Sequence, residues 1–177
     1  MRMQIWKIPV VALLFAAVLT GCGEDPDKER FRQELIDKAL NDDTRKAGTE
    51  FLAQNREREG VQVTASGLQI EHLRKGEGAH PGAGDTVVVH YEGTRVDGGV
   101  FDSSYQREQP ATFPLNQVIK GWREGLMLMQ EGGEAMLYLP PELAYGATSP
   151  TPEIPANSTL IFRVELLKVI NAQESTQ

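Results

Sequence analysis

The chain has 177 residues, of which 40% are hydrophobic, and its formal net charge is −7. This length allows one ordinary globular domain with an appendage, and the hydrophobic fraction is typical of a chain with a packed core. The acidic balance argues against nucleic acid as a partner, because phosphate binding depends on clustered Lys and Arg. After residue 21, no apolar run is long enough to span a bilayer.

The N-terminal segment has the pattern of an export signal. Two basic residues precede an apolar run over residues 8–19, which has the length of a signal-peptide core and is short for a transmembrane helix. The run ends in Leu-Thr-Gly-Cys at residues 19–22, which resembles the bacterial lipobox. The resemblance implies that residues 1–21 are removed and that the Cys22 thiol is lipidated. A plain signal peptide or a signal anchor is the alternative.

Cys22 is the sole cysteine, as suits a thiol that is capped in an oxidising compartment. Acyl chains on Cys22 would attach the protein to a membrane, because each buried CH₂ contributes roughly 0.8 kcal/mol and more than one chain is needed. Gly23 rather than Asp follows this cysteine, and by resemblance to enteric lipoproteins that favours the outer membrane. We therefore expect a lipid-anchored protein of the bacterial cell envelope, on the periplasmic face of the outer membrane.

Residues 22–60 are rich in charges of both signs and are predicted to be helical. Asp25 is the expected N-cap and Pro26 the expected first helical residue. A narrow apolar stripe follows, lapses at residues 41–44 and then resumes, as one helix weakened at Gly48 or as two shorter helices. The segment is either a solvated tether that lies on the next domain or a dimerisation helix. The stripe consists of Phe31, Leu35, Ile36, Ala39 and Leu40, then Ala47, Phe51 and Leu52.

Residues 61–171 have the pattern of a second, strand-rich domain, and residues 172–177 form a tail. One helical pattern, over residues 117–129, interrupts the strands. A twisted antiparallel β-sheet wrapped around one short α-helix is the economical architecture, so the predicted fold class is α+β. Strands are expected at 67–74, 86–94, 134–139 and 159–170, a hairpin turn at 97–99, and a proline-rich loop at 149–155.

Familiar catalytic sets are missing from the sequence. It has no Gly-x-Ser-x-Gly elbow and no phosphate-binding Gly-rich loop. Its histidines, His72, His80 and His90, lack the spacing of metal ligands and are interpreted as surface or packing residues. We therefore expect no metal and no cofactor.

Several segments carry a family resemblance. Five blocks, in order, resemble FKBP-type peptidyl-prolyl cis-trans isomerases over residues 64–170: residues 89–93, 99–104, 118–122, 143–147 and 159–167. Residues 51–55, 60–69 and 110–116 further resemble the bacterial envelope branch, which contains the macrophage infectivity potentiator proteins and the FkpA-like chaperones.

The resemblance implies rotation about X–Pro bonds in unfolded or nascent envelope proteins, with tacrolimus-like macrolides as inhibitors. Because rotation changes no covalent bond, this activity agrees with the missing nucleophile. The alternative is a peptide-binding chaperone or surface interaction module that uses the same pocket.

The resemblance also assigns roles to residues of the pocket. The implied walls are Tyr91, Phe101, Val118, Ile119, Trp122 and Phe162, with Trp122 as the floor. Asp102 would act at the pocket edge with Arg107 as its partner, and Phe101, Asp102 and Tyr145 would be catalytic. The Ile119 N–H and the Tyr145 phenol would donate to substrate carbonyls, and Ile154 would lie on a loop that closes over the ligand.

Each residue alone has another interpretation. Trp122 and Phe162 could be core residues, and Asp102 and Tyr145 could organise turns. Three departures from the small cytosolic family members put the rim of the site in doubt: Ala111 in place of an aromatic, a shorter segment over residues 113–118, and Pro150 in place of a loop histidine.

Overall fold

The computed structural model describes residues 27–28, 30–32, 35 and 42–172, and it confirms the α+β class. Its centre is a seven-stranded antiparallel sheet in the order β1-β2-β6-β7-β3-β4, with β5 also paired to β3. The elements are α2 (Asp43–Asn55), β1 (Val61–Val63), β2 (Gln69–Arg74), β3 (Thr86–Arg95), β4 (Val100–Ser103), β5 (Ala111–Pro114), η1 (Leu115–Gln117), α3 (Lys120–Met127), β6 (Glu134–Leu139), η2 (Pro141–Leu143) and β7 (Leu160–Ile170).

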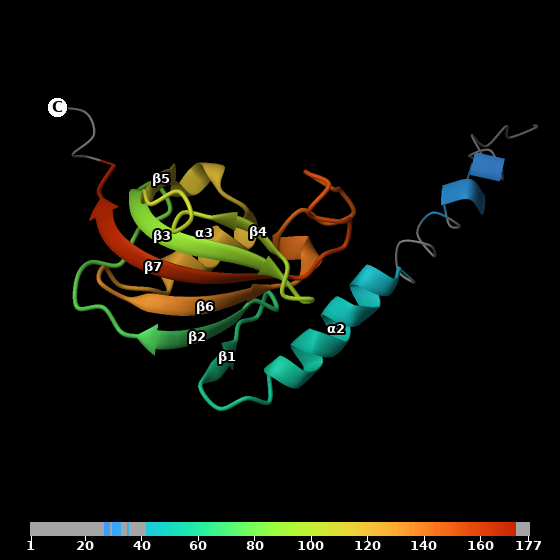
Figure 1. The fold of residues 1–177 in the computed structure, drawn as a ribbon, viewed down its shortest axis with the longest axis horizontal. Coiled ribbons are helices and arrows are strands. Elements are labelled where there is room, and N and C mark those ends of the chain that lie inside the picture. The colour runs from blue at the N-terminus through green and yellow to red at the C-terminus, as the bar shows by residue number, and fades with distance from the viewer. Residues whose placement is uncertain (1–26, 29, 33–34, 36–41, 173–177) are drawn as a thin grey trace, which may run out of the picture.

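The sheet curves, and α3 lies against one of its faces (Figure 1). The longest pairing joins β3 to β7, from Thr86 opposite Ile170 to Arg95 opposite Leu160. Alternate residues of these strands point between the sheet and α3, and this is where the core lies. Fully buried core side chains include Val87, Val89, Leu115, Leu126, Leu137, Leu139, Leu160, Val164 and Leu166.

The long strands predicted from alternation are all present, within two residues of the expected ends. The predicted turn at residues 97–99 connects β3 to β4. The prediction did not include β1, β4 and β5, which have only three or four residues each. A strand this short does not have enough residues to display a period of two.

The predicted helix over residues 117–129 is wrong at its beginning. Helix α3 begins at Lys120, and Gln117 instead ends the 3₁₀ turn η1. Val118 and Ile119 between them are extended, with ψ angles of 165° and 154°. Val118 lies on the same helical face as Trp122 in a projection of the sequence, which is why the periodicity extended too far.

The structure shows one continuous helix, α2, on both sides of Gly48. It begins at Asp43 and continues through Gly48, and its N-cap Asp42 accepts a hydrogen bond from the Thr44 amide. The polar stretch at 41–44 therefore contains a helix start. Upstream, Phe31 and Leu35 are helical and exposed. The predicted features at Cys22, Asp25, Pro26, Ile36, Ala39 and Leu40 lie outside the described residues.

Helix α2 lies across the end of the sheet that carries β1 and β2 (Figure 1). The buried Asn55 amide donates to Gln69 Oε1, and Gln69 Nε2 donates to the Leu52 carbonyl, both at 2.8 Å. The Phe51 and Tyr138 rings are 5.9 Å apart. These contacts fasten the helix to the domain. Within the described part of the chain, we find no helix with the length and apolarity needed to cross a membrane.

Candidate functional site

A cavity of about 360 Å³ opens between β3, β4, β5 and the beginning of α3. It lies beside the core, and its lining combines large apolar side chains with one carboxylate. The lining residues are Tyr91, Phe101, Asp102, Phe113, Gln117, Val118, Ile119, Trp122, Tyr145 and Phe162.

Trp122 is the centre of an aromatic cluster that forms the inner end of the cavity. Its ring meets Tyr91, Phe113 and Phe162 edge to face, with centroid distances of 5.0, 5.5 and 5.2 Å. Edge-to-face contacts place the positive rim of one ring on the negative face of another. Trp122 is 5% exposed and therefore belongs to the core as well as to the cavity. The interpretation of Trp122 as a core residue is confirmed, and its place at the inner end of the cavity agrees with the expected floor.

Gly93 on β3 makes room for the aromatic wall. Phe101 on β4 and Phe162 on β7 meet edge to face, with centroids 5.6 Å apart. A Cβ atom on Gly93 would come within 2.6 Å of the Phe101 ring and 2.9 Å of the Phe162 ring. Any larger residue at position 93 would push one of these rings out of the wall.

Asp102 at the cavity edge is held by two neighbours. The Tyr91 hydroxyl donates to Asp102 Oδ2 at 2.5 Å, and Arg107 forms an ion pair with Asp102 Oδ1. Arg107 Nη2 also donates to the Tyr91 hydroxyl at 2.9 Å. Hydrogen bonds to charged groups are stronger than neutral ones. The carboxylate is therefore fixed in orientation at the boundary between an apolar cavity and solvent.

Burial controls the titration of the Tyr91 phenol. Desolvation raises its pKa above the usual value of 10.0, and the hydrogen bond to Asp102 raises it further, while the bond from Arg107 opposes both. Tyr91 is 4% exposed, and the Arg107 guanidinium lies 5.6 Å from its ring centroid. Tyr91 therefore stays protonated near neutral pH and acts as a hydrogen-bond donor.

The structure brings together most of the site residues expected from the sequence. Tyr91, Phe101, Asp102, Val118, Ile119, Trp122, Tyr145 and Phe162 all line the cavity. Ile119 lies directly before α3, and Tyr145 is 39% exposed at the rim.

Arg107 and Ile154 lie elsewhere. Arg107 reaches the cavity through Asp102 and Tyr91 rather than by lining it. Ile154 is 5% exposed and packs into the core, on the loop that follows η2.

Two cavity residues, Phe113 and Gln117, were not expected from the sequence. Phe113 precedes Pro114 in the short strand β5, whose pairing with β3 turns the ring toward Trp122. Gln117 was assigned to a helix that begins three residues later. The signal available for Phe113 was its place in the block at 110–116 that resembles the envelope branch.

Comparison with known families gives two matches. Residues 77–167 match the model of the FKBP-type peptidyl-prolyl cis-trans isomerase. Residues 18–71 match the model of the domain amino terminal to FKBP-type peptidyl-prolyl isomerase. The first match contains the whole cavity, and the second contains α2, β1 and the first half of β2.

Individual relatives agree with these matches. The FKBP-type peptidyl-prolyl cis-trans isomerase FkpA of Aeromonas hydrophila is 52% identical over 127 residues, which cover 72% of this chain and 47% of the relative. The outer membrane protein MIP of Legionella longbeachae is 42% identical, with coverages of 81% and 64%. The crystal structure of FkpA from Escherichia coli aligns with a TM-score of 0.72 at 42% identity, over 82% of this chain and 69% of that one. The chain spans about half the length of several curated relatives that it matches.

Proposed function

This chain belongs to the family of FKBP-type peptidyl-prolyl cis-trans isomerases, and on that premise we propose that it catalyses rotation about X–Pro bonds in folding proteins. The observation that carries the proposal is the apolar, aromatic cavity with a fixed carboxylate at its edge. Its substrates are proline-containing segments of unfolded or nascent chains. Tacrolimus-like macrolides are the expected inhibitors, because they would occupy the same cavity.

Catalysis of this rotation requires mainly a cavity from which water is excluded. The barrier to rotation, about 18–20 kcal/mol, is the amide resonance lost when the bond twists. In the twisted state the carbonyl is less charge-separated, so removal of water favours the twisted state over the planar one. A turnover on the order of 10³ s⁻¹ requires about 5–7 kcal/mol of such preference. The rings around Trp122 supply the desolvated surface on which a proline ring would rest.

Polar groups at the rim would hold the substrate in place. In this proposal Asp102 interacts with the carbonyl region of the rotating bond, and Arg107 and Tyr91 keep its carboxylate pointed at the cavity. The Ile119 backbone N–H and the Tyr145 hydroxyl donate to substrate carbonyls on either side of proline. Ile154 supports the loop that carries Tyr145 from within the core.

A protease-coupled assay of a proline peptide tests this function. The full chain in a mild detergent should accelerate isomerisation, and tacrolimus should abolish the acceleration. Phe101→Ala and Asp102→Ala should each remove most of the activity. Full activity in both variants would contradict the assignment of the site, and no activity in the wild type would contradict the function.

The same variants separate catalysis from the alternative chaperone role. A holdase would suppress aggregation of an unfolded client even with Asp102→Ala and with the cavity saturated by macrolide. Loss of suppression under both conditions would make the cavity itself responsible for client handling.

We further propose attachment to the bacterial envelope through lipid on Cys22. The support is the apolar run and Leu-Thr-Gly-Cys at residues 19–22, together with a relative that is named an outer membrane protein. Labelled palmitate should be incorporated by the wild type and not by Cys22→Ser. Fractionation of the two membranes tests the periplasmic face of the outer membrane.

The segment before α2 supports a homodimer as a further proposal. Phe31 and Leu35 are 63% and 52% exposed, and a narrow stripe of this kind suits a two-helix seam. Sedimentation at high concentration tests it: a monomer would exclude the dimer, and Phe31→Ser should dissociate one.

A further inference from the structure

The loop between η2 and β7 carries Tyr145 and is held by backbone hydrogen bonds at Gly146, the residue after it. The Asn157 amide donates to the Gly146 carbonyl at 2.7 Å, and the Gly146 amide donates to the Pro141 carbonyl at 2.8 Å. These two bonds fix the backbone directly after Tyr145. Asn157 adopts a left-handed conformation with φ of 60° and is 4% exposed. The position of the Tyr145 side chain at the cavity rim therefore depends on the placement of Asn157.

The N-cap residue of α2 contacts this loop. The Asn157 side-chain amide donates to Asp42 Oδ2 at 3.3 Å, and Asp42 Oδ1 accepts from the Thr44 amide at 2.9 Å. One carboxylate thus caps the helix and binds the loop. Asp42 lies 115 positions before Asn157 in the sequence, so the link is created by the fold.

The other contacts between α2 and this region cannot fix the loop by themselves. Gly48 allows close approach, since a Cβ there would lie 2.3 Å from Thr159 Oγ1, but that hydroxyl has no hydrogen-bond partner within the described residues. Arg45 pairs with Glu142 at an exposed position, and exposed ion pairs contribute little.

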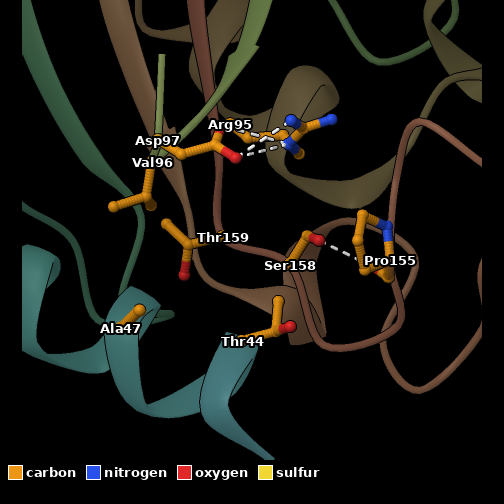
Figure 2. Close-up of a pocket in the computed structure, with 8 residues that line it drawn as sticks. All are labelled: Thr44, Ala47, Arg95, Val96, Asp97, Pro155, Ser158 and Thr159. Carbon is orange, nitrogen blue, oxygen red and sulfur yellow. Dashed lines mark hydrogen bonds and ion pairs between the residues drawn. The ribbon is translucent and has the colours of Figure 1, made fainter. Parts of the chain in front are cut away.

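A groove of about 360 Å³ lies beside these contacts, and Figure 2 shows the residues that line it. The groove separates Ala47 on α2 from the hairpin residues Val96 and Asp97. Among the described residues, Asp42 at the N-cap of α2 supplies a directional side-chain bond to the loop.

We infer that Asp42 is a positioning residue for the cavity, because through Asn157 it holds the backbone that places Tyr145. The inference rests on the proposed isomerase function, since Tyr145 matters through its contact with substrate. It also gives the segment before α2 a route to the site: a change at the N-terminus of α2 reaches the cavity rim through one side-chain bond.

A side-chain swap tests the inference. Asn157→Asp keeps the left-handed backbone, which Asp tolerates, and sets two carboxylates against each other. We expect kcat/KM for the proline peptide to fall about tenfold. Exchanging both side chains, as Asp42→Asn with Asn157→Asp, restores a donor and an acceptor, and Asn is as good an N-cap as Asp. The double variant should recover to within about twofold of the wild type.

A second background separates positioning from general destabilisation. The Tyr145→Phe variant already lacks the hydroxyl donor. Adding Asn157→Asp to it should lower kcat/KM by less than about a further twofold, because the two changes act through one group. Asn55→Ala, which loosens the far end of α2, should lower Tm without the tenfold loss. Additive losses with Tyr145→Phe, or no rescue in the swapped variant, would overturn the inference.

Hydrogen exchange provides a readout that does not require catalysis. Amides of residues 144–159 should exchange faster in Asn157→Asp and return to wild-type rates in the swapped variant. An inactive wild type would remove the isomerase proposal, while exchange would still decide whether Asp42 holds the loop. An active wild type with unchanged exchange and activity in Asn157→Asp would remove the inference alone. If Asn157→Asp does not fold, Asp42→Asn alone should raise exchange in the same loop.

Discussion

The structure contains two hollows of equal volume, about 360 Å³ each, that differ in the side chains that line them. Six aromatic residues line the cavity beside α3, and the edge-to-face contacts of Trp122 and Phe162 fix five of their rings against one another. The groove beside α2 is lined by small, polar and flexible side chains, and none of the eight residues drawn in Figure 2 is aromatic. Equal volumes with different walls show that volume alone does not distinguish the two hollows, and that the aromatic rings are what the cavity has and the groove lacks.

Each hollow also has an Asp that pairs with an Arg, although Arg107 itself does not line the cavity. Asp102 pairs with Arg107 and accepts a bond from the buried Tyr91 hydroxyl. Asp97 pairs with Arg95 in the exposed hairpin turn, and its pKa is lowered mainly by that hydrogen bond. The same two residue types thus stabilise a turn in one place and orient a carboxylate toward an apolar cavity in the other.

The largest expected effect is on the floor of the cavity. Trp122→Ala should lower the free energy of unfolding by about 3–5 kcal/mol, because the core loses ring contacts and is left with a void. Urea unfolding measures this. The matched change in the groove, Val96→Ala, should cost less than about 1 kcal/mol. Similar losses in free energy of unfolding for the two variants would mean that the cavity and the groove contribute equally to stability.

The charge at the cavity edge should have the next largest effect. Asp102→Asn preserves shape and removes the charge, so we expect kcat/KM to fall about tenfold. Asp97→Asn makes the same change in the groove and should leave kcat/KM within about twofold of the wild type. A loss in Asp97→Asn equal to that in Asp102→Asn would contradict the distinction between the two pairs.

The pH dependence of stability tests the role of the Tyr91 hydroxyl at the cavity edge. Tyr91→Phe removes the bond to Asp102 and should lower stability by about 1 kcal/mol near pH 7. Because the folded-state pKa of Tyr91 is raised above 10.0, its contribution is complete below pH 10 and is lost as pH rises toward the folded-state value. The free energy of unfolding, measured from pH 8 to 11, should fall less steeply in Tyr91→Phe. A slope equal to that of the wild type would mean that burial does not raise this pKa.

The smallest expected effect is on the free energy of unfolding at acid pH, through Asp42 at the N-cap of α2. The Thr44 amide lowers the pKa of Asp42 below 3.8. Its contribution to stability is therefore complete above pH 3.8 and is lost as pH falls through the folded-state value. In Asp42→Asn the side chain does not titrate, so the free energy of unfolding should fall less steeply below pH 4 than in the wild type. The difference between the two proteins should be less than about 1 kcal/mol. Thermal unfolding from pH 5 to 2.5 compares the two, and parallel curves would contradict the assignment.

Gln69 marks a limit of sequence-based prediction in the fold. Alternation along residues 67–74 places it on the outer, polar face of the sheet, and yet it is buried. The outer face at this point is covered by α2, whose Leu52 carbonyl and Asn55 amide satisfy both ends of the Gln69 side chain. A period of two reports which face a residue is on, but it does not report whether another element covers that face.

The same limit of sequence-based prediction applies to the candidate site. Trp122, Phe162 and Asp102 were identified from ordered blocks of residues, because each block is a local pattern. Phe113 was not expected at the site, because its place there depends on the pairing of β5 with β3. Val118 and Ile119 were expected to line the cavity and do line it, but they were assigned to a helix that begins only at Lys120. Local periodicity cannot indicate where a helix starts when the residues before it continue the apolar stripe.

The sequence by itself determined the α+β class and the long strands, because hydrophobic period is a property of short segments, and its resemblance to a known family implied most of the aromatic wall and the partnership of Asp102 with Arg107. Only the tertiary structure decided that the Tyr91 hydroxyl also holds Asp102, which polar residues are buried under α2, and that Asp42 meets Asn157. Each of these depends on side chains brought together from distant parts of the chain, where hydrogen-bond geometry over a few ångströms decides the outcome.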